Sequence, residues 1–204
     1  MDDKPFAPSA ERNRDAILAT LGNELVDTDH VFEFGSGTGQ HVCHFAAHHP
    51  SITWQPSDLA VRLPGMKQWI AESGCKNILP PVTLDLQSEP LASTGATVCY
   101  SANTLHIVSW PLVQRLFLHA ATLLADGGKL CIYGPFLFNG QYTSEGNHLF
   151  DQQLRSQDSA SGLREFNDLN VLAERYLFSH RRTIDLPANN QLLVWERVVT
   201  NAPG

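Results

Sequence analysis

Short apolar runs alternate with longer amphipathic stretches along most of this chain. Five runs have the length and composition of buried strands, the third of them weakly: residues 31–34, 52–56, 82–85, 97–102 and 129–133. Four stretches place apolar residues three or four positions apart, as helices with one buried face do: residues 10–25, 40–48, 62–73 and 111–125. The alternation predicts a parallel sheet covered by helices.

The last third of the chain breaks this alternation. Residues 137–162 form a polar stretch with no regular pattern, and a helix is expected over 165–176. RRTIDL and LLVWERV are strand-like and are separated only by PANNQ, which predicts an antiparallel hairpin, because parallel strands need a crossover of about a dozen residues. The expected fold is therefore α/β and Rossmann-like, with a seven-stranded, mostly parallel sheet, an antiparallel last strand and helices on both faces.

Composition narrows the class of protein. The 204 residues, 43% hydrophobic and 17% charged, suit one globular domain over 1–204, in which 1–25 forms an N-terminal helix or cap. No apolar run approaches the roughly 18 residues of a membrane span, and no basic region precedes an apolar segment near the N-terminus, so a cytoplasmic location is expected. The net charge of −7, with 14 scattered Lys and Arg, disfavours nucleic acid as a partner.

The four cysteines, Cys43, Cys75, Cys99 and Cys131, are far apart in the sequence and form no C-x-x-C pair. A cysteine inside an apolar or helical pattern behaves as a small hydrophobe. We interpret all four as reduced core residues.

The stretch VFEFGSGTGQ, residues 31–40, carries the strongest chemical signal. Gly35, Gly37 and Gly39 follow the first strand directly, with Ser36 and Thr38 between them, and a helix is expected to begin after them. Glycines at a strand-to-helix turn let backbone N–H groups approach a ligand closely, which predicts a nucleotide or nucleoside site. The plain alternative is a glycine turn that only reverses the chain.

Glu33 and the glycine spacing indicate which ligand. Dinucleotide sites use G-x-G-x-x-G, whereas the pattern here is G-x-G-x-G with an acid two residues before it. An acid at the strand tip repels a pyrophosphate and attracts a cation, and S-adenosylmethionine carries a sulfonium and an ammonium. The pattern resembles the first motif of the class I S-adenosylmethionine-dependent methyltransferases. An NAD(P)-dependent oxidoreductase is the alternative from the same fold class, although it leaves Glu33 and the antiparallel finish unexplained.

Polar residues end the next strands, where open α/β sheets bind their ligands. Asp58 ends the second strand 23 residues after Gly35, near the spacing of an acid that binds ribose hydroxyls; the alternative is an N-cap of the next helix. By the resemblance, Asp85 and Leu86 after the third strand contact adenine. Asn103, at the tip of the fourth strand, is expected to hold the methionine end of the cofactor or the acceptor.

Histidines crowd the helix expected over 40–48. His44 and His48 are four residues apart and His41 shares their face, which is a spacing that metal sites use. No carboxylate lies in that helix, however, and a partly exposed helix surface accommodates histidines. We therefore predict no metal site.

Seven segments extend the resemblance over nearly the whole chain: PFAPSAERNRDAIL, FGSGTGQHVCHFA, WQPSD, NTLHIVSW, GGKLCIYGPF, YTSEGNHLFDQQLR and PANNQLLVWER. Together and in this order they resemble the DUF938 family, also called UPF0585, a family expected to consist of methyltransferases. The resemblance implies the fold and S-adenosylmethionine as cofactor, and it assigns no acceptor.

Methyl transfer from a sulfonium depends mainly on positioning, and a base is needed only if the acceptor must lose a proton. The candidates for base or acceptor positioning are His106, Tyr133, Tyr142 and Asp151; for His106 a purely structural role is the alternative. The candidates for binding the acceptor are Arg12, Asn13, Trp110, Asn147, Arg155 and Arg164. Residues 137–162 are expected to form a lid or an acceptor pocket, or else an ordinary surface excursion.

The expected activity is thus methyl transfer from S-adenosylmethionine to a small-molecule acceptor. A binding or regulatory protein that keeps the fold and the cofactor without turnover is the second hypothesis. It stays open because NTLH, residues 103–106, stands where an acceptor signature such as D-P-P-Y would be expected.

Overall fold

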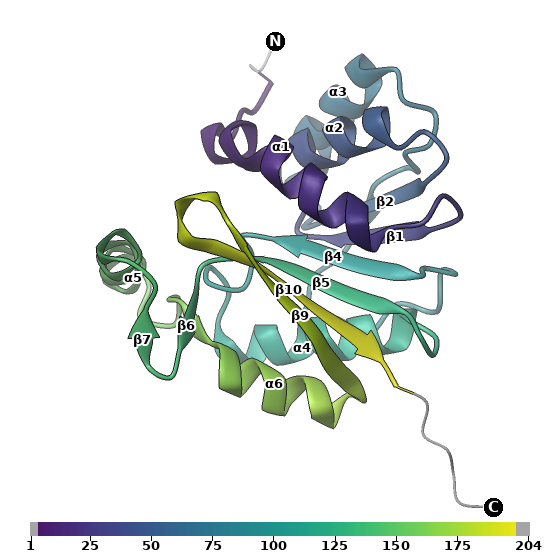
Figure 1. The fold of residues 1–204 in the computed structure, drawn as a ribbon. Coiled ribbons are helices and arrows are strands. Elements are labelled where there is room, and N and C mark those ends of the chain that lie inside the picture. The colour runs from purple at the N-terminus through teal and green to yellow at the C-terminus, as the bar shows by residue number, and fades with distance from the viewer. Residues whose placement is uncertain (1–3, 199–204) are drawn as a thin grey trace, which may run out of the picture.

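Seven strands form the central sheet of the computed structural model, which describes residues 4–198 (Figure 1). The strand order is β3-β2-β1-β4-β5-β10-β9. The first five strands run parallel, whereas β10 runs antiparallel to both of its neighbours. The strands cover His30–Phe34 (β1), Thr53–Asp58 (β2), Val82–Thr83 (β3), Val98–Ala102 (β4), Lys129–Gly134 (β5), Phe178–Leu186 (β9) and Asn190–Arg197 (β10). The predicted seven-stranded, mostly parallel sheet is confirmed.

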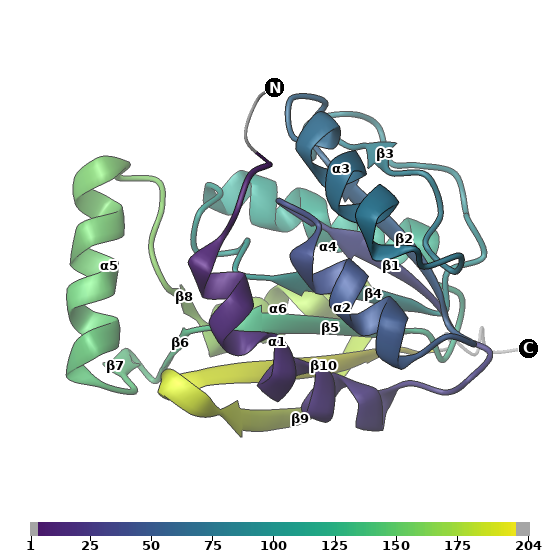
Figure 2. The ribbon, with the colours of Figure 1, turned by 90° about the horizontal axis from the view of Figure 1, so that it is seen from above.

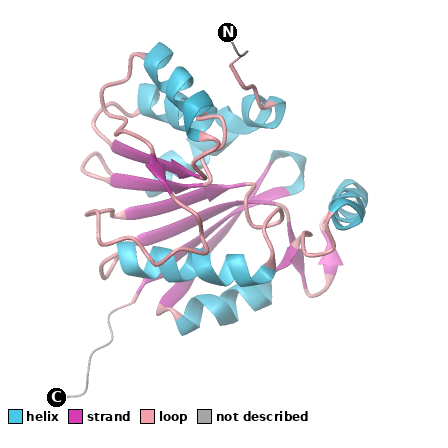
Figure 3. Ribbon diagram, turned by 180° about the vertical axis from the view of Figure 1, so that it is seen from behind, coloured by secondary structure: helices cyan, strands magenta, loops and turns pink. Residues whose placement is uncertain are grey.

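Helices cover both faces of this sheet (Figures 1 and 3). The helices α1, α2 and α3 pack on one face, and α4 and α6 pack on the other. Their bounds are Pro8–Leu21 (α1), Gln40–His48 (α2), Leu63–Ser73 (α3), Trp110–Leu123 (α4) and Phe166–Arg175 (α6), and two 3-10 turns cover Gly22–Glu24 (η1) and Pro187–Asn189 (η2). The expected elements lie within a few residues of these bounds, although the first helix stops earlier than predicted and β3 is only two residues long.

Helix α4 illustrates how the sequence builds the core. Ser109 precedes it in an extended conformation, and a proline occupies its first turn, where no backbone N–H is needed. A buried stripe then follows at helical spacing: Val113, Leu116, Phe117, Ala120 and Leu123. This stripe shares one core cluster with Phe32 and Phe34 of β1. Each large side chain buried in this way contributes about 1.5 to 3 kcal/mol, so β1 is firmly held where it leads into the glycine turn.

Residues 137–162 are not irregular, and this prediction was wrong. They contain helix α5 (Glu145–Gln157), and a small sheet in the order β7-β6-β8 flanks it, with bounds Phe136–Phe138 (β6), Gln141–Tyr142 (β7) and Arg164–Glu165 (β8). Figure 2 shows α5 standing beside the main body. The apolar pattern missed this helix because the side chains that it buries, Asn147 and Asp151, are polar. The usable signal was the N-cap: Ser144 Oγ accepts the N–H of Asn147 at 3.1 Å.

Three cysteines agree with the interpretation from sequence, since Cys43, Cys99 and Cys131 are buried and free. Cys75 is also free, but it is only half-buried at the edge of the core between the sheet and α2. Over residues 4–198 no helix is long and apolar enough to cross a membrane. The cytoplasmic location stays a prediction.

Candidate ligand site

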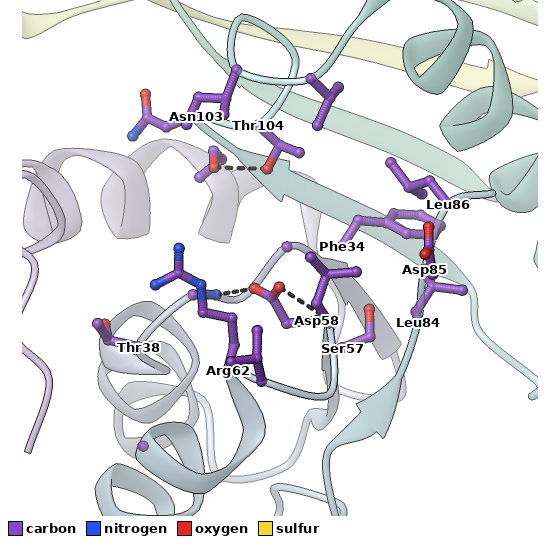
Figure 4. Close-up of a pocket in the computed structure, with 18 of the residues that line it drawn as sticks. Phe34, Thr38, Ser57, Asp58, Arg62, Leu84, Asp85, Leu86, Asn103 and Thr104 are labelled. Carbon is purple, nitrogen blue, oxygen red and sulfur yellow. Dashed lines mark hydrogen bonds between the residues drawn. The ribbon is translucent and has the colours of Figure 1, made fainter. Parts of the chain in front are cut away.

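A cavity of about 700 Å³ opens at the carboxyl ends of β1, β2 and β4 (Figure 4). The chain runs outward from β1 to β3 and then returns to β4 on the other side of β1, so the cavity lies at the switch in strand order, where such sheets bind ligands. Seven of the predicted cofactor residues line it: Gly35, Gly37, Thr38, Asp58, Asp85, Leu86 and Asn103. The other three, Glu33, Ser36 and Gly39, are not part of the lining.

The glycine turn is shaped by close approaches from two other elements. Gly35 has a φ of +67°, and a Cβ there would lie 2.7 Å from Oγ1 of Thr104, just after β4. Gly39 has a φ of +86°, and a Cβ there would lie 2.9 Å from Cγ of Met66 in α3. Both positions therefore exclude a side chain on steric grounds as well as by conformation. The turn does more than reverse the chain, because it brings the ends of β1 and β4 together around the cavity.

Asp58, the last residue of β2, ties that strand to the glycine turn. Its Oδ2 accepts the N–H of Gly37 at 2.7 Å, and its Oδ1 accepts the N–H of Leu59 at 2.7 Å. Figure 4 shows the carboxylate beside the turn. The alternative role as an N-cap is wrong, because α3 begins at Leu63 with Arg62 in the cap position. The carboxylate instead holds the backbone at two cavity-lining residues, Gly37 and Leu59.

The opposite end of the cavity is apolar. Phe34, Leu84 and Leu86 gather there next to the Asp85 carboxylate (Figure 4). Oδ1 of Asp85 accepts the N–H of Gln87 at 2.9 Å, which shapes the turn after β3. From α4, Arg115 Nε donates to the carbonyl oxygen of Leu86 at 3.1 Å. This wall is therefore fixed through its backbone.

Glu33 is buried behind the glycine turn, with 2% of its surface exposed. Its Oε2 has no hydrogen-bond partner among residues 4–198. Burial raises the pKa of Glu33 to about 7; the Ser36 hydroxyl opposes this shift and the charge of Asp58 adds to it. Ser36 also joins the turn to β2, because its Oγ accepts the N–H of Ser57 at 3.1 Å. An unpaired buried carboxyl at this point favours a cation close by.

Residues 4–7, here called the N-terminal strap, form the outer wall of the cavity through Pro5 and Ala7. Trp69 Nε1 in α3 donates to the carbonyl oxygen of Pro5 at 2.7 Å. The N–H of Ala7 donates to Oε1 of Gln40, the first residue of α2, at 2.6 Å. The Pro5 ring lies so near Gly65 of α3 that a Cβ on that glycine would meet Pro5 Cγ at 2.3 Å. The strap thus depends on a glycine 60 positions away in the sequence.

The loop after β4 presents two faces. Asn103 begins it with a φ of +55°, a conformation that asparagine tolerates, and donates its N–H to the carbonyl oxygen of Tyr133 at 2.9 Å. His106 does not line the cavity; its ring packs against Phe150 of α5, with centroids 5.3 Å apart. Burial, helped by the charge of Arg164, lowers the pKa of His106 to about 4. The ring is therefore neutral at physiological pH.

Four more candidates from the sequence lie around α5, outside the cavity lining, and three of them form one network centred on Asp151. Oδ2 of Asp151 accepts the hydroxyl of Tyr142 at 2.8 Å and Nε of Arg155 at 2.9 Å, and Oδ1 accepts the N–H of Leu163 at 2.7 Å. Asn147 Nδ2 donates to the carbonyl oxygen of Asn189 in η2 at 2.9 Å. These contacts hold α5 against the small sheet and the terminal hairpin. None of residues 137–162 lines the cavity, so an acceptor role for this segment stays a prediction.

The remaining candidates are dispersed, and none of them lines the cavity. Arg164 directs its guanidinium at backbone carbonyls. Arg12 is exposed on α1, and Trp110 is half-buried at the start of α4. Asn13 Oδ1 lies 2.8 Å from Nε2 of His41. Burial raises the pKa of Tyr133, and a hydrogen bond with the Asn13 side chain opposes that shift.

The histidines of α2 have separate partners. His41 contacts Asn13, His44 Nε2 lies 2.9 Å from a carboxylate oxygen of Asp15, and His48 Nδ1 contacts the carbonyl oxygen of His44 at 2.8 Å. Within residues 4–198 no group of three or more His, Cys, Asp or Glu side chains could hold a metal ion.

Sequence reasoning missed the lining residues that the N-terminal strap and the start of α3 contribute to the cavity. Pro5, Ala7, Arg62 and Gly65 all line it, yet none belongs to the glycine motif or follows a strand directly. Nothing in the sequence pairs Pro5 with Gly65. Ser57 and Thr104 could have been found, because both adjoin residues already selected at strand ends.

The fold is that of the S-adenosylmethionine-dependent methyltransferases. The chain is similar to the S-adenosylmethionine-dependent methyltransferase SibL in its apo form, with a TM-score of 0.80 and 17% identity over 94% of this chain and 56% of that one. It is also similar to an O-methyltransferase family 2 protein from Planctomyces limnophilus in complex with apigenin, with a TM-score of 0.78 and 16% identity over 93% of this chain and 60% of that one. A third similar structure is human N-acetylserotonin methyltransferase in complex with SAM, with a TM-score of 0.78 and 15% identity over 94% of this chain and 53% of that one. The chain thus spans 53% to 60% of the length of these structures.

The family is shown by a direct match. The chain belongs to the DUF938 family, whose model matches residues 4–197 and whose description is "protein of unknown function". The resemblance to DUF938 noted from the sequence is thereby confirmed, while an activity is left to be argued from the site.

Proposed function

We propose that this protein is an S-adenosylmethionine-dependent methyltransferase that acts on a small-molecule acceptor. The observation that carries the proposal is the Asp58 carboxylate, which supports the N–H of Gly37 at 2.7 Å within the wall of the cavity. This arrangement joins an open glycine turn to an acid at the next strand end, as binding of a ribose beside a backbone turn requires.

The residues of the cavity fit this cofactor. Phe34, Leu84 and Leu86 offer apolar surface to a purine, and Asp85 beside them offers an acceptor to an exocyclic amine. A carboxylate has about four lone-pair sites, so Asp58 keeps capacity for ribose hydroxyls beyond its two backbone donors. The buried Glu33 favours a cationic ligand over a pyrophosphate.

The chain itself supplies position and environment for the transfer. When bound, S-adenosylmethionine would supply a methyl group on a positively charged sulfur. Gly35 and Gly37 keep side chains away from the methionine part, and Asn103 offers an amide at the tip of β4. Holding the two reactants in line accounts for most of the catalysis in such a transfer.

His106 is the first base candidate, because it is next to Ile107 of the cavity wall. Its neutral ring can accept a proton from an acceptor, and it lies next to Gly134, the last residue of β5. Because the ring is not in the cavity wall, this role requires the acceptor to approach from the α5 side of the loop. Tyr133 is the second candidate, whereas both oxygens of Asp151 are already engaged.

The proposal is tested by ligand binding. S-adenosylhomocysteine and S-adenosylmethionine should raise the melting temperature of the protein, and NAD(H) and NADP(H) should not. Asp58→Ala should weaken binding of S-adenosylmethionine by about 1 to 3 kcal/mol in calorimetry, because charged hydrogen bonds are lost. The control is Asp168→Ala on the exposed surface of α6, where the affinity should not change. The reverse response, to dinucleotides only, would remove the methyltransferase proposal.

Turnover needs a separate measurement. Labelled S-adenosylmethionine should transfer its methyl group to at least one fraction of a small-molecule library in the presence of the protein. Binding of the cofactor without transfer to any fraction would instead favour the binding or regulatory protein.

A further inference from the structure

The loop between β4 and α4, residues 103–109, has four consecutive carbonyl oxygens that accept hydrogen bonds from one other segment. The carbonyl oxygens of residues 105–108 each accept a hydrogen bond from residues 161–164, the segment that follows α5. Carbonyls of a surface loop are usually left to water. Here a second segment satisfies them in sequence, which fixes the loop along its length.

Arg164 makes the two outer bonds of this set. Its Nε donates to the carbonyl oxygen of Leu105 at 2.9 Å, and its Nη2 donates to the carbonyl oxygens of Val108 and Ala160. The residue is 9% exposed, and no ion pair to it occurs within residues 4–198. A buried charge without an opposite charge is costly unless hydrogen bonds compensate for it. The planar guanidinium can reach two carbonyls at fixed spacing, as an ammonium cannot.

Ser161 and Gly162 make the two inner bonds. Ser161 Oγ donates to the carbonyl oxygen of Ile107 at 2.6 Å, and the N–H of Gly162 donates to that of His106 at 2.9 Å. Gly162 has a φ of +134°, and a Cβ there would meet Cζ of Arg155 at 2.5 Å. Only glycine fits between the loop and α5 at this point.

The loop that is held in this way separates two surfaces. Ile107 and Val108 line the ligand cavity, whereas His106 faces Gly134 and Phe150 on the other side. A shift of the loop backbone would change both surfaces at once, because the three residues are consecutive.

We propose that Arg164 is a positioning residue, which holds the loop so that Ile107 and Val108 stay in the cavity wall and His106 stays on the opposite face. The proposal rests on the proposed function, in which the cavity wall binds the cofactor and His106 acts as the base. Arg164 does not touch the ligand; it acts through the carbonyls of Leu105 and Val108. The sequence predicts that Arg164 binds the acceptor, a role for which its backbone partners leave its guanidinium poorly placed.

The test uses Arg164→Met with two readouts on the full chain. Calorimetry with S-adenosylhomocysteine should show at least about a tenfold loss of affinity, since two charged hydrogen bonds to the loop that carries the wall residues are removed. Titration of the His106 resonance by NMR, assigned by its absence in His106→Gln, should show a pKa that rises part of the way toward the ordinary value. Burial is the main cause of the low pKa, and the substitution removes the second cause, the charge of Arg164. The control is Arg175→Met, exposed at the end of α6, which should change neither.

Two milder variants keep the test decisive if Arg164→Met does not fold. Ser161→Ala removes only the bond to Ile107 and should lower the affinity by a smaller factor. Arg164→Lys retains the charge but loses the fork, so the affinity should fall. In this variant the pKa of His106 should rise only through exposure of its ring as the loop shifts, because the positive charge is kept. Unchanged affinity together with an unmoved His106 pKa in the variants that fold would overturn the positioning role. Failure of the unmodified protein to bind S-adenosylhomocysteine would instead contradict the proposed function, and the NMR readout would still decide on Arg164.

Discussion

The inner and outer walls of the cavity are built in different ways. The inner wall consists of strand ends and the turns after them, and buried side chains such as Ser36 and Arg164 fix its backbone. The outer wall is the N-terminal strap, which rests on α3 through the exposed ring of Phe6, Trp69 and the ion pair between Lys4 and Glu72. The inner wall is thus preorganised for a ligand, while the outer wall is held by contacts that single side chains can release.

This difference predicts different roles for the inner and the outer wall. Buried hydrogen bonds lose much when one partner is removed, so the inner wall should tolerate few changes. The strap is held by an exposed ion pair, worth about 0 to 1 kcal/mol, and by the hydrogen bonds of Pro5 and Ala7, worth about 1 kcal/mol each, so it should open at a lower cost than the inner wall. We expect the inner wall to set which ligand fits and the outer wall to set how readily it enters and leaves.

The largest effect should come from the inner wall, with Gly35→Ala. A Cβ at this position meets Thr104 Oγ1 at 2.7 Å and must adopt a φ of +67°, so strain and overpacking together should cost about 4 kcal/mol of unfolding free energy. Urea denaturation measures the loss. Gly35→Ala combined with Thr104→Ala should recover the overpacking part only. Equal stability of Gly35→Ala and the unmodified protein would mean that the two strand ends are less firmly joined than described.

The next effect concerns Glu33 and depends on pH. Because burial raises its folded-state pKa from 4.5 to about 7, the folded protein holds a proton that the unfolded chain has lost between these values. The contribution of Glu33 to stability is therefore greatest below pH 4.5 and falls as the pH rises to about 7, by up to about 3 kcal/mol.

Glu33→Gln should remove this dependence, because glutamine does not titrate. The variant should gain stability over the unmodified protein at pH 8 and match it near pH 4.5 in urea denaturation. Its affinity for S-adenosylmethionine at pH 8 should fall, since the ionised carboxylate favours a cation. Parallel stability curves for the two proteins between pH 4.5 and 8 would contradict the burial of an unpaired carboxyl here.

The smallest effect should come from the outer wall, with Gly65→Ala. The added methyl group displaces Pro5, so the affinity for S-adenosylhomocysteine should fall roughly fivefold, or about 1 kcal/mol. The fold should gain or keep stability, because alanine favours the helix by about 1 kcal/mol over glycine.

Gly146→Ala in α5 is the matched control for this change. A Cβ there would lie 3.7 Å from Ser144 Oγ, an ordinary contact, so stability should rise without a change in affinity. If Gly65→Ala binds the ligand as well as this control does, the strap is not a functional wall.

The sequence predicted the inner wall well because local patterns encode it. Gly35 and Gly37 lie in the turn just after β1 and Asp58 ends β2, and parallel strands end at the same edge of a sheet. The outer wall could not be predicted in this way, because the contact between Pro5 and Gly65 joins segments that no periodicity relates. Helix α5 was not predicted for a different reason. It is held by polar contacts such as that of Asp151 with Leu163, and apolar spacing does not reveal such a helix.

The strap also decides where the molecule can be labelled or tethered. Pro5 lies in the cavity wall, so a fluorophore attached to the side chain at position 4 would sit beside the ligand and would report its arrival. The described chain ends differently: Glu196 of β10 pairs with Lys129, the first residue of β5, at the edge of the sheet opposite the cavity. For immobilisation on a surface, attachment through a side chain at this end of β10 is therefore the choice that leaves the ligand site free.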